Sequence, residues 1–346
     1  MEDISRVFID TSKSVFQLHG VDSAERVAVR RKLRRSEVLG YFAKLPATVV
    51  GLEACGGSHH LARELVRLGH APRLVPAQYV KAYLKRGKND ARDAEAGCEA
   101  MSRPTMRVVP VKTADQQAGL MLVGVRDRLV RGRTQLGNEI RGYAAEFGLV
   151  APKGLDKIEP LLARVAEDEV LPELARDLFA GLGAEYTRLQ AEIAGLDRRL
   201  KAWARREPQS ERLAQIPSIG PIGAALLTLK TPDPSGFRSA RDFAAWLGLT
   251  PKDHSTAGKT RLGGITKKGD KMLRRVMVSG AMALLQRVRR GQTPPPWPWL
   301  TPLLAKPPKL AAVAVANRVA RIAWRMIVSG QAYAPPPREA PQPLAA

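Results

Sequence analysis

The sequence predicts an α/β domain at the N-terminus, followed by a chain that is mostly helical. Over residues 5–101, short apolar or alternating runs interleave with helical patterns in the order β-β-β-α-β-α-β-α. From residue 113 onward, apolar residues recur at helical spacing over much longer segments. The 346 residues are enough for two or three domains with separate cores.

The α/β part is assigned to residues 1–105. Arg6–Asp10 is a short apolar strand, and the alternation of 14–21 makes that segment its hairpin partner. Further strands are expected at 26–33, 48–53 and 71–75, and helices at 36–45, 59–68 and 90–101. This order puts Asp10 on the first strand and Glu53 at the end of the fourth.

The remaining chain is divided into three parts. Residues 106–208 are expected to form a helical or coiled-coil spacer, with one long helix over 114–147 and a helical hairpin or coiled coil over 161–203. Residues 209–332 are expected to form a mostly helical C-terminal domain, ending in a helix over 309–330. Proline excludes regular helix or sheet from 293–308, which is predicted to be an extended loop. The Pro-rich tail, 333–346, is predicted to be disordered.

The charge balance is the unusual feature of the composition. Lys and Arg number 56 against 33 Asp and Glu, a net charge of +23. This excess predicts a polyanionic partner, and nucleic acid is favoured over a membrane surface. No apolar run approaches the roughly 20 residues of a membrane span, and Met1–Ile4 does not begin a signal peptide. Cys55 and Cys98 are interpreted as reduced core residues, so we expect a cytoplasmic protein.

Four acidic residues carry the strongest indication of chemistry. Asp10 and Glu53 each close an apolar run, and Asp90 and Asp93 lie three residues apart on one helix face. Carboxylates that converge on one point repel unless cations neutralise them, and hard oxygen ligands suit Mg²⁺ or Mn²⁺. In so basic a chain, such a site predicts metal-dependent chemistry on nucleic acid. Lys13, close to Asp10, is a candidate phosphate contact.

A second motif lies at Ile216–Gly223, where glycines separate two apolar helical segments. The pattern is similar to a helix-hairpin-helix, in which Gly220 and Gly223 expose backbone N–H groups at a helix start to a phosphate. The other interpretation is an ordinary tight turn between two helices.

A third motif is the Gly- and Lys-rich stretch from Gly248 to Arg275. Between Lys252 and Arg275 there are eight Lys or Arg against two Asp. A serine hydroxyl at the centre of such a loop, Ser255, can attack phosphorus when its proton is removed, although a lone loop serine is usually a turn residue. The basic residues expected to hold a phosphodiester are Lys259, Arg261, Lys267, Lys268, Lys271, Arg274 and Arg275.

Together these motifs resemble one family closely, over residues 5 to about 330. It comprises insertion-sequence transposases with an N-terminal DEDD RuvC-like domain and a C-terminal serine domain, the bridge-RNA-guided recombinases. The segments that carry the resemblance are 9–13, 52–56, 89–94, 216–223, 248–251 and 255–275. The chain departs from the family at Ser255-Thr256-Ala257-Gly258, where a Ser-Gly or Ser-Ser/Thr-Gly pair is common. Thr256 therefore stays a rival nucleophile.

The resemblance implies a fold and a mechanism. The N-terminal domain would have the ribonuclease-H fold of RuvC-type nucleases, and Asp10, Glu53, Asp90 and Asp93 would bind Mg²⁺ or Mn²⁺. Ser255 would form a covalent phosphoserine link to donor and target double-stranded DNA, within a dimer or tetramer. A non-coding bridge RNA would guide the choice of sequence. Two alternatives are a structure-specific, Holliday-junction endonuclease that uses metal-activated water, and a non-catalytic RNA-binding protein.

Overall fold

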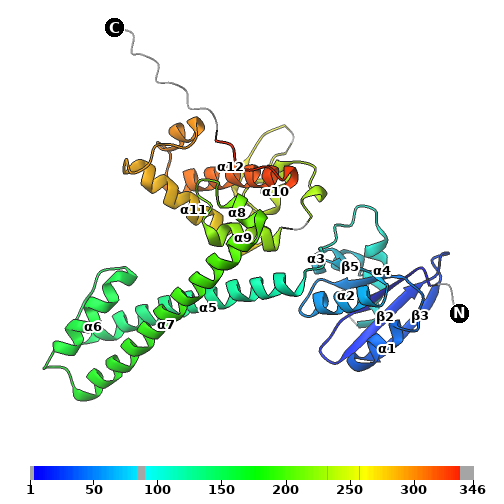
Figure 1. Cartoon of the computed structure of the whole chain (residues 1–346), viewed down its shortest axis with the longest axis horizontal. Helices are drawn as coiled ribbons and strands as arrows, with labels where there is room; N and C mark the ends of the chain where they lie inside the picture. The colour runs from blue at the N-terminus through cyan, green and yellow to red at the C-terminus, as the bar shows by residue number, and fades with distance from the viewer. Residues whose placement is uncertain (1–3, 85–89, 232, 257, 336–346) are drawn as a thin grey trace, which may run out of the picture. The chain divides into compact units, whose positions relative to one another are not determined.

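The structure, a computed structural model, describes residues 4–84, 90–231, 233–256 and 258–335, without the side chain of Asp90. The chain divides into two compact units, the first comprising residues 1–117 with 232–236 and the second 118–231 with 237–346 (Figure 1). The long helix α5 (Ala114–Glu146) begins in the first unit and continues into the second. The predicted division into four parts stays a prediction, and residues 336–346 of the predicted tail lie outside the described residues.

The first unit is built on a five-stranded mixed sheet in the order β3-β2-β1-β4-β5. β1 pairs antiparallel with β2 and parallel with β4; β2 pairs antiparallel with β3, and β4 parallel with β5. The strands are β1 (Arg6–Asp10), β2 (Val15–Val21), β3 (Val27–Arg34), β4 (Val49–Glu53) and β5 (Ala71–Val75). Each of the five strands predicted from the sequence is confirmed to within one or two residues.

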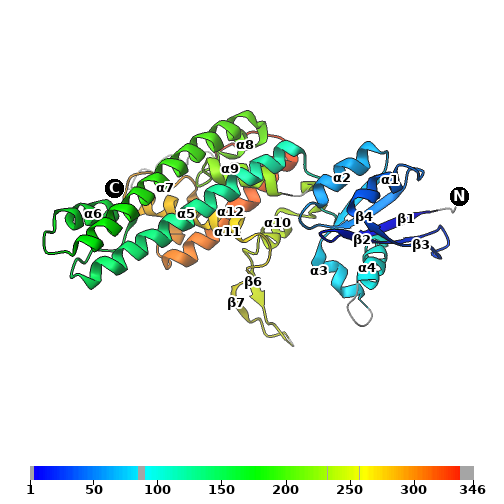
Figure 2. The ribbon, with the colours of Figure 1, turned by 90° about the horizontal axis from the view of Figure 1, so that it is seen from below.

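Side-chain alternation along the strands gives the sheet two covered faces. Val7, Ile9 and Leu52 point into a core that contains the short helix α1 (Val38–Phe42) and α2 (Ser58–Arg67). Phe8 points to the opposite face, into a core shared with α3 (Ala77–Val80) and α4 (Asp90–Ser102). Figure 2 shows α1 and α2 on one side of the sheet and α3 and α4 on the other. Three 3₁₀ turns complete the unit: η1 (Arg35–Glu37), η2 (Lys81–Tyr83) and η4 (Pro234–Gly236).

The second unit contains two helical cores. In one, α5 packs with α6 (Ile158–Glu167) and α7 (Glu173–Arg206) around Ile140, Phe179 and Tyr186, beside η3 (Leu155–Lys157). The predicted hairpin over 161–203 is thus α6 followed by α7. The other core is formed by the helices α8 (Pro208–Leu213), α9 (Pro221–Lys230), α10 (Ala240–Trp246), α11 (Lys271–Arg289) and α12 (Pro308–Ser329).

Three sequence-based expectations are corrected by the structure. A two-stranded antiparallel sheet, β6 (Pro251–Asp253) and β7 (Leu262–Ile265), lies within the stretch expected to be helix and loop. The Pro-rich stretch contains a 3₁₀ helix, η5 (Pro298–Leu303), because Pro298 takes the first helical position, where no N–H donor is needed, and Leu300 is buried. Cys98 is buried as expected, but Cys55 is exposed, because it follows the last residue of β4 into a turn.

The segment that leads from α4 to α5 is held against α2. The Lys112 amide donates to Nδ1 of His59 at 3.1 Å, and Arg63 donates to the Lys112 carbonyl at 2.7 Å. Burial, followed by the charges of Lys112 and Arg63, lowers the pKa of His59 to about 4. A neutral His59 is therefore built into the first unit, since protonated Nδ1 cannot accept the Lys112 hydrogen bond.

This arrangement predicts acid sensitivity of the first unit. Because the folded pKa of about 4 is below the ordinary value of 6.5, the unfolded chain binds more protons between these values. The stabilising contribution of neutral His59 is complete above about pH 6.5 and is lost as the pH falls toward 4. We expect the thermal midpoint of His59→Gln, which keeps an acceptor, to fall less than that of the wild type between pH 7 and pH 4.5.

The matched control is His60→Gln, since His60 is the exposed neighbour of His59 on the same helix. Its midpoint should follow the wild-type pH profile. If His59→Gln and the wild type lose stability in parallel, another group controls the acid sensitivity.

Candidate active site and nucleic-acid interface

Asp10 and Glu53 lie at neighbouring ends of two parallel strands. β1 and β4 pair in parallel with Ile9 opposite Leu52, so the next residue on each strand is the acidic one. Both carboxylates fall on the face that bears Phe8 and Gly51, because side chains alternate along each strand. The structure therefore confirms that these two predicted residues share one edge and one face of the sheet, and each is half-buried.

The face of the sheet that bears Asp10 and Glu53 is covered by α4, which runs antiparallel to β1. Arg6, the first residue of β1, donates to the Cys98 carbonyl near the end of α4 at 3.3 Å, whereas Gly97 packs on the ring of Phe8. Asp93 precedes Gly97 by one helical turn, toward the end of β1 that carries Asp10, and Asp90 begins the helix. Backbone topology thus directs the start of α4 toward the two strand-end carboxylates.

Two glycines allow this close approach of helix and sheet. A Cβ atom on Gly97 would overlap the Phe8 ring, and one on Gly51 would meet both Phe8 and Met101. The rigid ring and the buried methionine leave no room for a side chain at either position.

The four predicted carboxylates fit a hard cation by chemistry, since all are oxygen donors without a competing soft ligand. Among the residues whose side chains are described, no group of three or more His, Cys, Asp or Glu is arranged to hold a metal ion. The side chain of Asp90 lies outside that set, so the four-residue metal site stays a prediction.

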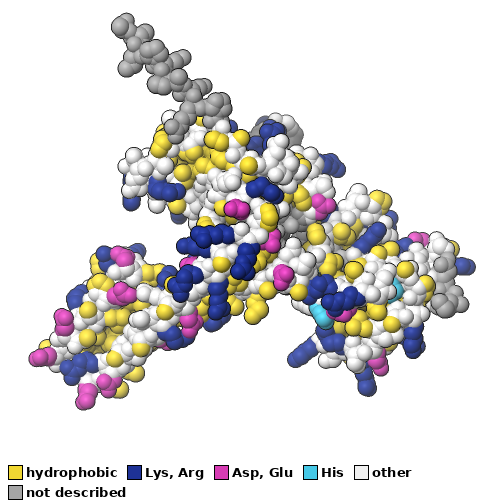
Figure 3. Space-filling view, viewed as in Figure 1, with side chains coloured by type: hydrophobic (Ala, Val, Ile, Leu, Met, Phe, Trp, Pro, Cys, Tyr) yellow, Lys and Arg dark blue, Asp and Glu magenta, His cyan; other side chains and the backbone are white. Residues whose placement is uncertain are grey.

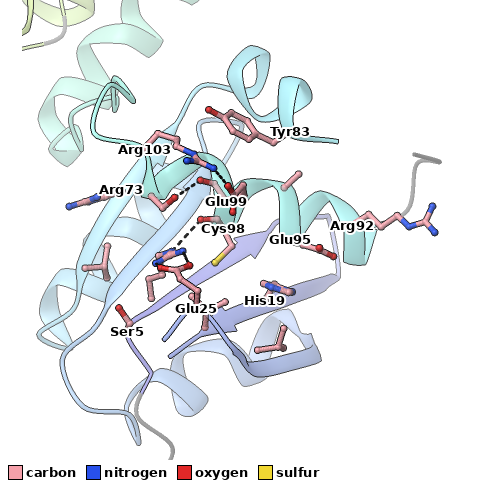
Figure 4. A pocket seen from close by; sticks show the side chains of 16 residues that line it. Ser5, His19, Glu25, Arg73, Tyr83, Arg92, Glu95, Cys98, Glu99 and Arg103 are labelled. Atoms are coloured by element: carbon pink, nitrogen blue, oxygen red, sulfur yellow. Dashed lines mark hydrogen bonds and ion pairs between the residues drawn. The ribbon is translucent and has the colours of Figure 1, made fainter. Parts of the chain in front are cut away.

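A cavity of about 960 Å³ lies on the same face, along the length of α4 from Arg92 to Ser102. Figure 4 shows His19 of β2 and Glu95 of α4 on its walls, with Cys98 beside them, whereas Arg92 points away from the start of α4. Burial lowers the pKa of His19 and raises that of Cys98, so both groups are neutral near pH 7. Asp10, Glu53 and Asp93 are not among its lining residues, and an ion pair between Arg6 and Glu25 ties the β2–β3 turn to its wall.

Ser255 lies in an exposed hairpin of the second unit. Strands β6 and β7 project from the helices around α10 (Figure 2), and every described residue from Pro251 to Gly264 is exposed. The Ser255 amide donates to Asp253 Oδ1 at 2.8 Å, and the Arg261 amide donates to the Ser255 hydroxyl at 3.0 Å. Hydrogen bonds from the Ser255 side chain and then its amide lower the pKa of Asp253, which stays a carboxylate. These bonds hold the turn and set the direction of the hydroxyl.

The base of this hairpin is fixed by tight backbone contacts. Gly248 and Gly269 both adopt a left-handed conformation, with φ of +72° and +81°. A Cβ atom on Gly269 would overlap the Trp246 carbonyl, so only glycine fits there. Asn317 of α12 adds a hydrogen bond of 3.3 Å to the Leu249 carbonyl.

The Ile216–Gly223 segment joins α8 to α9, as a helix-hairpin-helix would. Gly220 is the exposed N-cap of α9, without a side-chain cap, but Gly223 is buried within the first turn. A cavity of about 730 Å³ adjoins this segment and is lined also by Arg126 and Arg131 of α5. The geometry supports phosphate contact at Gly220 more strongly than at Gly223.

The predicted basic contacts fall into two groups. Lys13 is exposed in the first unit, as are Lys259, Arg261, Lys267, Lys268 and Lys271 in the second. By contrast, Arg274 donates to the carbonyls of Leu247 and Lys268, and Arg275 forms an ion pair with Asp127. Lys and Arg side chains also gather over the middle of α5 and α7 (Figure 3).

Comparison with known proteins identifies the family. The model of the "Transposase IS116/IS110/IS902 family" matches residues 210–294, and a transposase model of the IS110 DEDD type matches residues 7–147. The chain is 60% identical, over 96% of its length and 86% of the relative's, to "Putative transposase y4pF/y4sB" of Sinorhizobium fredii. It is 45% identical to "Probable family 20 transposase" of Pseudomonas aeruginosa and 37% identical to "Transposase for insertion sequence element IS1328" of Yersinia enterocolitica, each over 96% of this chain and 99% of the relative.

The chain belongs to the IS110/IS116 family of transposases. The resemblance inferred from the sequence motifs is confirmed, and the protein is a transposase, an enzyme that processes DNA. Its N-terminal domain has the ribonuclease-H-like fold that the DEDD type implies. Such domains use divalent metal ions. None of the described helices is both long and apolar enough to cross a membrane.

One residue beside the candidate nucleophile was not identified from the sequence. Asp253 lies two residues before Ser255 and accepts its amide hydrogen bond. The signal was an Asp-x-Ser spacing inside a Gly-rich loop, which is typical of a turn closed by an aspartate side chain.

The close contact at Gly97 predicts a strong effect of a single methyl group. We expect Gly97→Ala to destabilise the first unit by about 1–3 kcal/mol, because the added Cβ forces α4 away from Phe8. The displaced helix should also weaken any stabilisation of the protein by Mn²⁺, measured as a rise in thermal midpoint.

The control is Gly40→Ala, at an exposed helical glycine of the same unit with open space around it. Alanine favours helix over glycine by up to about 1 kcal/mol, so this variant should be as stable as the wild type or more so. Equal changes in the free energy of unfolding for Gly97→Ala and Gly40→Ala would contradict the packing argument.

Proposed function

We propose that this transposase cuts and rejoins DNA through a covalent phosphoserine intermediate on Ser255, assisted by metal-binding carboxylates and guided by an RNA. The observation that carries the proposal is the exposed Ser255 hydroxyl, oriented by Asp253 and by the Arg261 amide in a basic hairpin. A hydroxyl in this position is open to a phosphodiester, and the surrounding lysines complement its charge.

In the serine step, Ser255 Oγ forms a bond to phosphorus and the bond from phosphorus to one deoxyribose oxygen breaks. The serine proton ends on the displaced oxygen, which leaves as a hydroxyl. Attack by that hydroxyl, or by one from another strand, reverses the step and reseals the backbone without hydrolysis. Lys259 and Arg261, which are exposed beside Ser255, would stabilise the charge that develops on the phosphate oxygens.

The carboxylates Asp10, Glu53, Asp90 and Asp93 would hold Mg²⁺ or Mn²⁺. The shared edge of Asp10 and Glu53, and the approach of α4 to that edge, support this assignment. When bound, such an ion supplies Lewis-acid stabilisation of phosphate oxygens. The protein's own contribution would be to hold Asp10, Glu53 and Asp93, from two strands and one helix, in half-buried positions.

The partners follow from the same proposal. Double-stranded donor and target DNA would contact Lys13, Gly220, Gly223 and the basic residues of the hairpin. A non-coding bridge RNA would select the sequences by base pairing, and a dimer or tetramer would bring the carboxylates and Ser255 to one phosphodiester. In the proposed domain division, the carboxylates belong to the DEDD domain and Ser255 to the serine domain, and the helical spacer lies between these two domains in the sequence.

Ser255→Ala is expected to abolish both strand cleavage and the covalent protein–DNA adduct. Removing the oxygen deletes the nucleophile, and the side chain is exposed, so packing is unaffected. The measurement is incubation with the ends of the element, its flanking RNA and Mg²⁺, followed by a denaturing gel. DNA binding, measured by anisotropy, should change less than about threefold, since phosphate contacts come from other residues.

Thr256→Ala is the matched control for Ser255→Ala and should keep the adduct. The opposite result would move the nucleophile to Thr256. If both variants cut normally and free 5′-phosphate ends accumulate, the protein is a metal-dependent endonuclease that uses water. Binding without cleavage by the wild type would instead support a non-catalytic RNA-binding protein.

Asp93→Asn is expected to reduce recombination at least 100-fold, because losing one charge weakens an ion held by few protein ligands. The variant should also lose the thermal stabilisation that Mn²⁺ gives to the wild-type protein, a readout independent of activity. Asp115→Asn, at an exposed acid in the first turn of α5, is the control and should behave as wild type. Normal Mn²⁺ stabilisation in Asp93→Asn would exclude this residue from the metal site.

A further inference from the structure

A second basic site lies on the helices of the second unit, outside the hairpin. Five arginines line a cavity of about 720 Å³ together with Trp299 and Trp324. We call Arg238, Arg241, Arg318, Arg321 and Arg325 the arginine cluster. Among the described residues, no Asp or Glu lines this cavity.

Three of these arginines share one face of α12. Arg318, Arg321 and Arg325 are spaced by three and four residues, which places them in a row on a helix. Arg238 and Arg241 flank the start of α10, a helix that packs against α12. Residues some 80 positions apart in the sequence are thereby brought to one cavity.

The like charges of the cluster are close enough to influence one another. Burial, followed by the charges of Arg318 and Arg241, lowers the pKa of Arg321. Its Nε atom is buried and has no hydrogen-bond partner among the described residues. Five cations around a cavity that no described carboxylate lines form a site that a bound anion would stabilise.

Aromatic rings hold one of the guanidinium groups in place. The Arg318 guanidinium carbon lies 4.6 Å from the centroid of the Trp299 ring, and that ring stacks on Trp297 with centroids 4.8 Å apart and an interplanar angle of 11°. Trp297 is buried and donates to the Tyr333 hydroxyl at 2.8 Å. A guanidinium stacked in this way loses little further freedom on binding and keeps its N–H edge for acceptor oxygens.

We propose that the arginine cluster binds the sugar–phosphate backbone of nucleic acid, at a site separate from the serine hairpin. The proposal rests on the proposed function, in that the protein acts on nucleic acid. Arginine matches phosphate oxygens with paired N–H donors, and several phosphates spaced along one strand match several guanidinium groups along α12. A solvated basic surface would not bury Arg321 Nε or stack Arg318 on a tryptophan pair.

The test uses the full-length protein with Arg318→Ala and Arg321→Ala combined. Binding to a 30-base-pair DNA duplex and to a 30-nucleotide RNA is measured by fluorescence anisotropy over a range of salt concentrations. We expect affinity for at least one of them to fall about tenfold or more. The slope of log affinity against log salt should also become shallower by roughly 1.4 to 1.8, since each phosphate contact contributes about 0.7 for a single strand and 0.9 for a duplex.

Two matched variants separate specific contacts from bulk charge. Arg198→Ala with Arg199→Ala removes the same charge from an exposed part of α7 and should weaken binding less than about threefold. Arg318→Lys with Arg321→Lys keeps the charge but not the paired donors or the stacking, and should recover only part of the lost affinity. Thermal unfolding of each variant checks the fold.

A loss confined to RNA assigns the cluster to an RNA strand, and a loss confined to the duplex assigns it to DNA. Wild-type affinity and salt slope for both ligands would overturn the proposal, as would an equal loss in the α7 variant. A changed oligomeric state with unchanged nucleic-acid binding would overturn it too, in favour of contact with a second protein copy. Because binding is measured without cleavage, the test of the arginine cluster stays valid even if the phosphoserine mechanism is wrong.

Discussion

The close packing of α4 on the sheet is the constraint on which the first unit depends. Because Gly97 and Gly51 have no side chains, α4 can pack directly on Phe8. The predicted carboxylates lie on the two elements that meet at this contact, with Asp10 and Glu53 on the sheet and Asp93 on α4. Asp10 and Glu53 are fixed by parallel pairing, whereas Asp93 is fixed only through the position of the helix. The geometry of the proposed metal site would therefore be set by apolar packing one turn away from its ligands.

The positive charge of the protein occurs in several structural settings. A net charge of +23 costs free energy in the absence of a polyanion, and the structure places cations in distinct settings. Those of the serine hairpin are exposed on an element with almost no core, whereas Arg318 and Arg321 are stacked or partly buried on a rigid helix. In the proposed mechanism, exposed lysines would suit the contacts that change as strands move, and the stacked arginines would suit a contact that persists.

Most of the first unit was predictable from the sequence, because strand alternation and helical spacing are local signals. The edge that carries Asp10 and Glu53 followed from two apolar runs that end in acids. The hairpin β6–β7 was missed because its residues are exposed, so no hydrophobic alternation marks it. The arginine cluster was missed for another reason: Arg241 and Arg318 meet only through the packing of α10 on α12, which no local pattern encodes.

The placement of Ser255 also bears on how its reactivity is controlled. A two-stranded hairpin is marginally stable in isolation, and this one is anchored at its base by contacts of Gly248, Gly269 and Asn317. Ser255 donates to the Asp253 carboxylate and accepts from the Arg261 amide, and these bonds orient the hydroxyl within the loop but do not fix the loop in space. In the proposed mechanism, binding of a phosphodiester by the exposed lysines would order the loop and the Ser255 hydroxyl in the same event, so part of the binding free energy would be used for alignment. In the proposed phosphoserine mechanism, an exposed serine on such an element would react with bound DNA in preference to other phosphates, because only a long polyanion makes enough contacts to hold it.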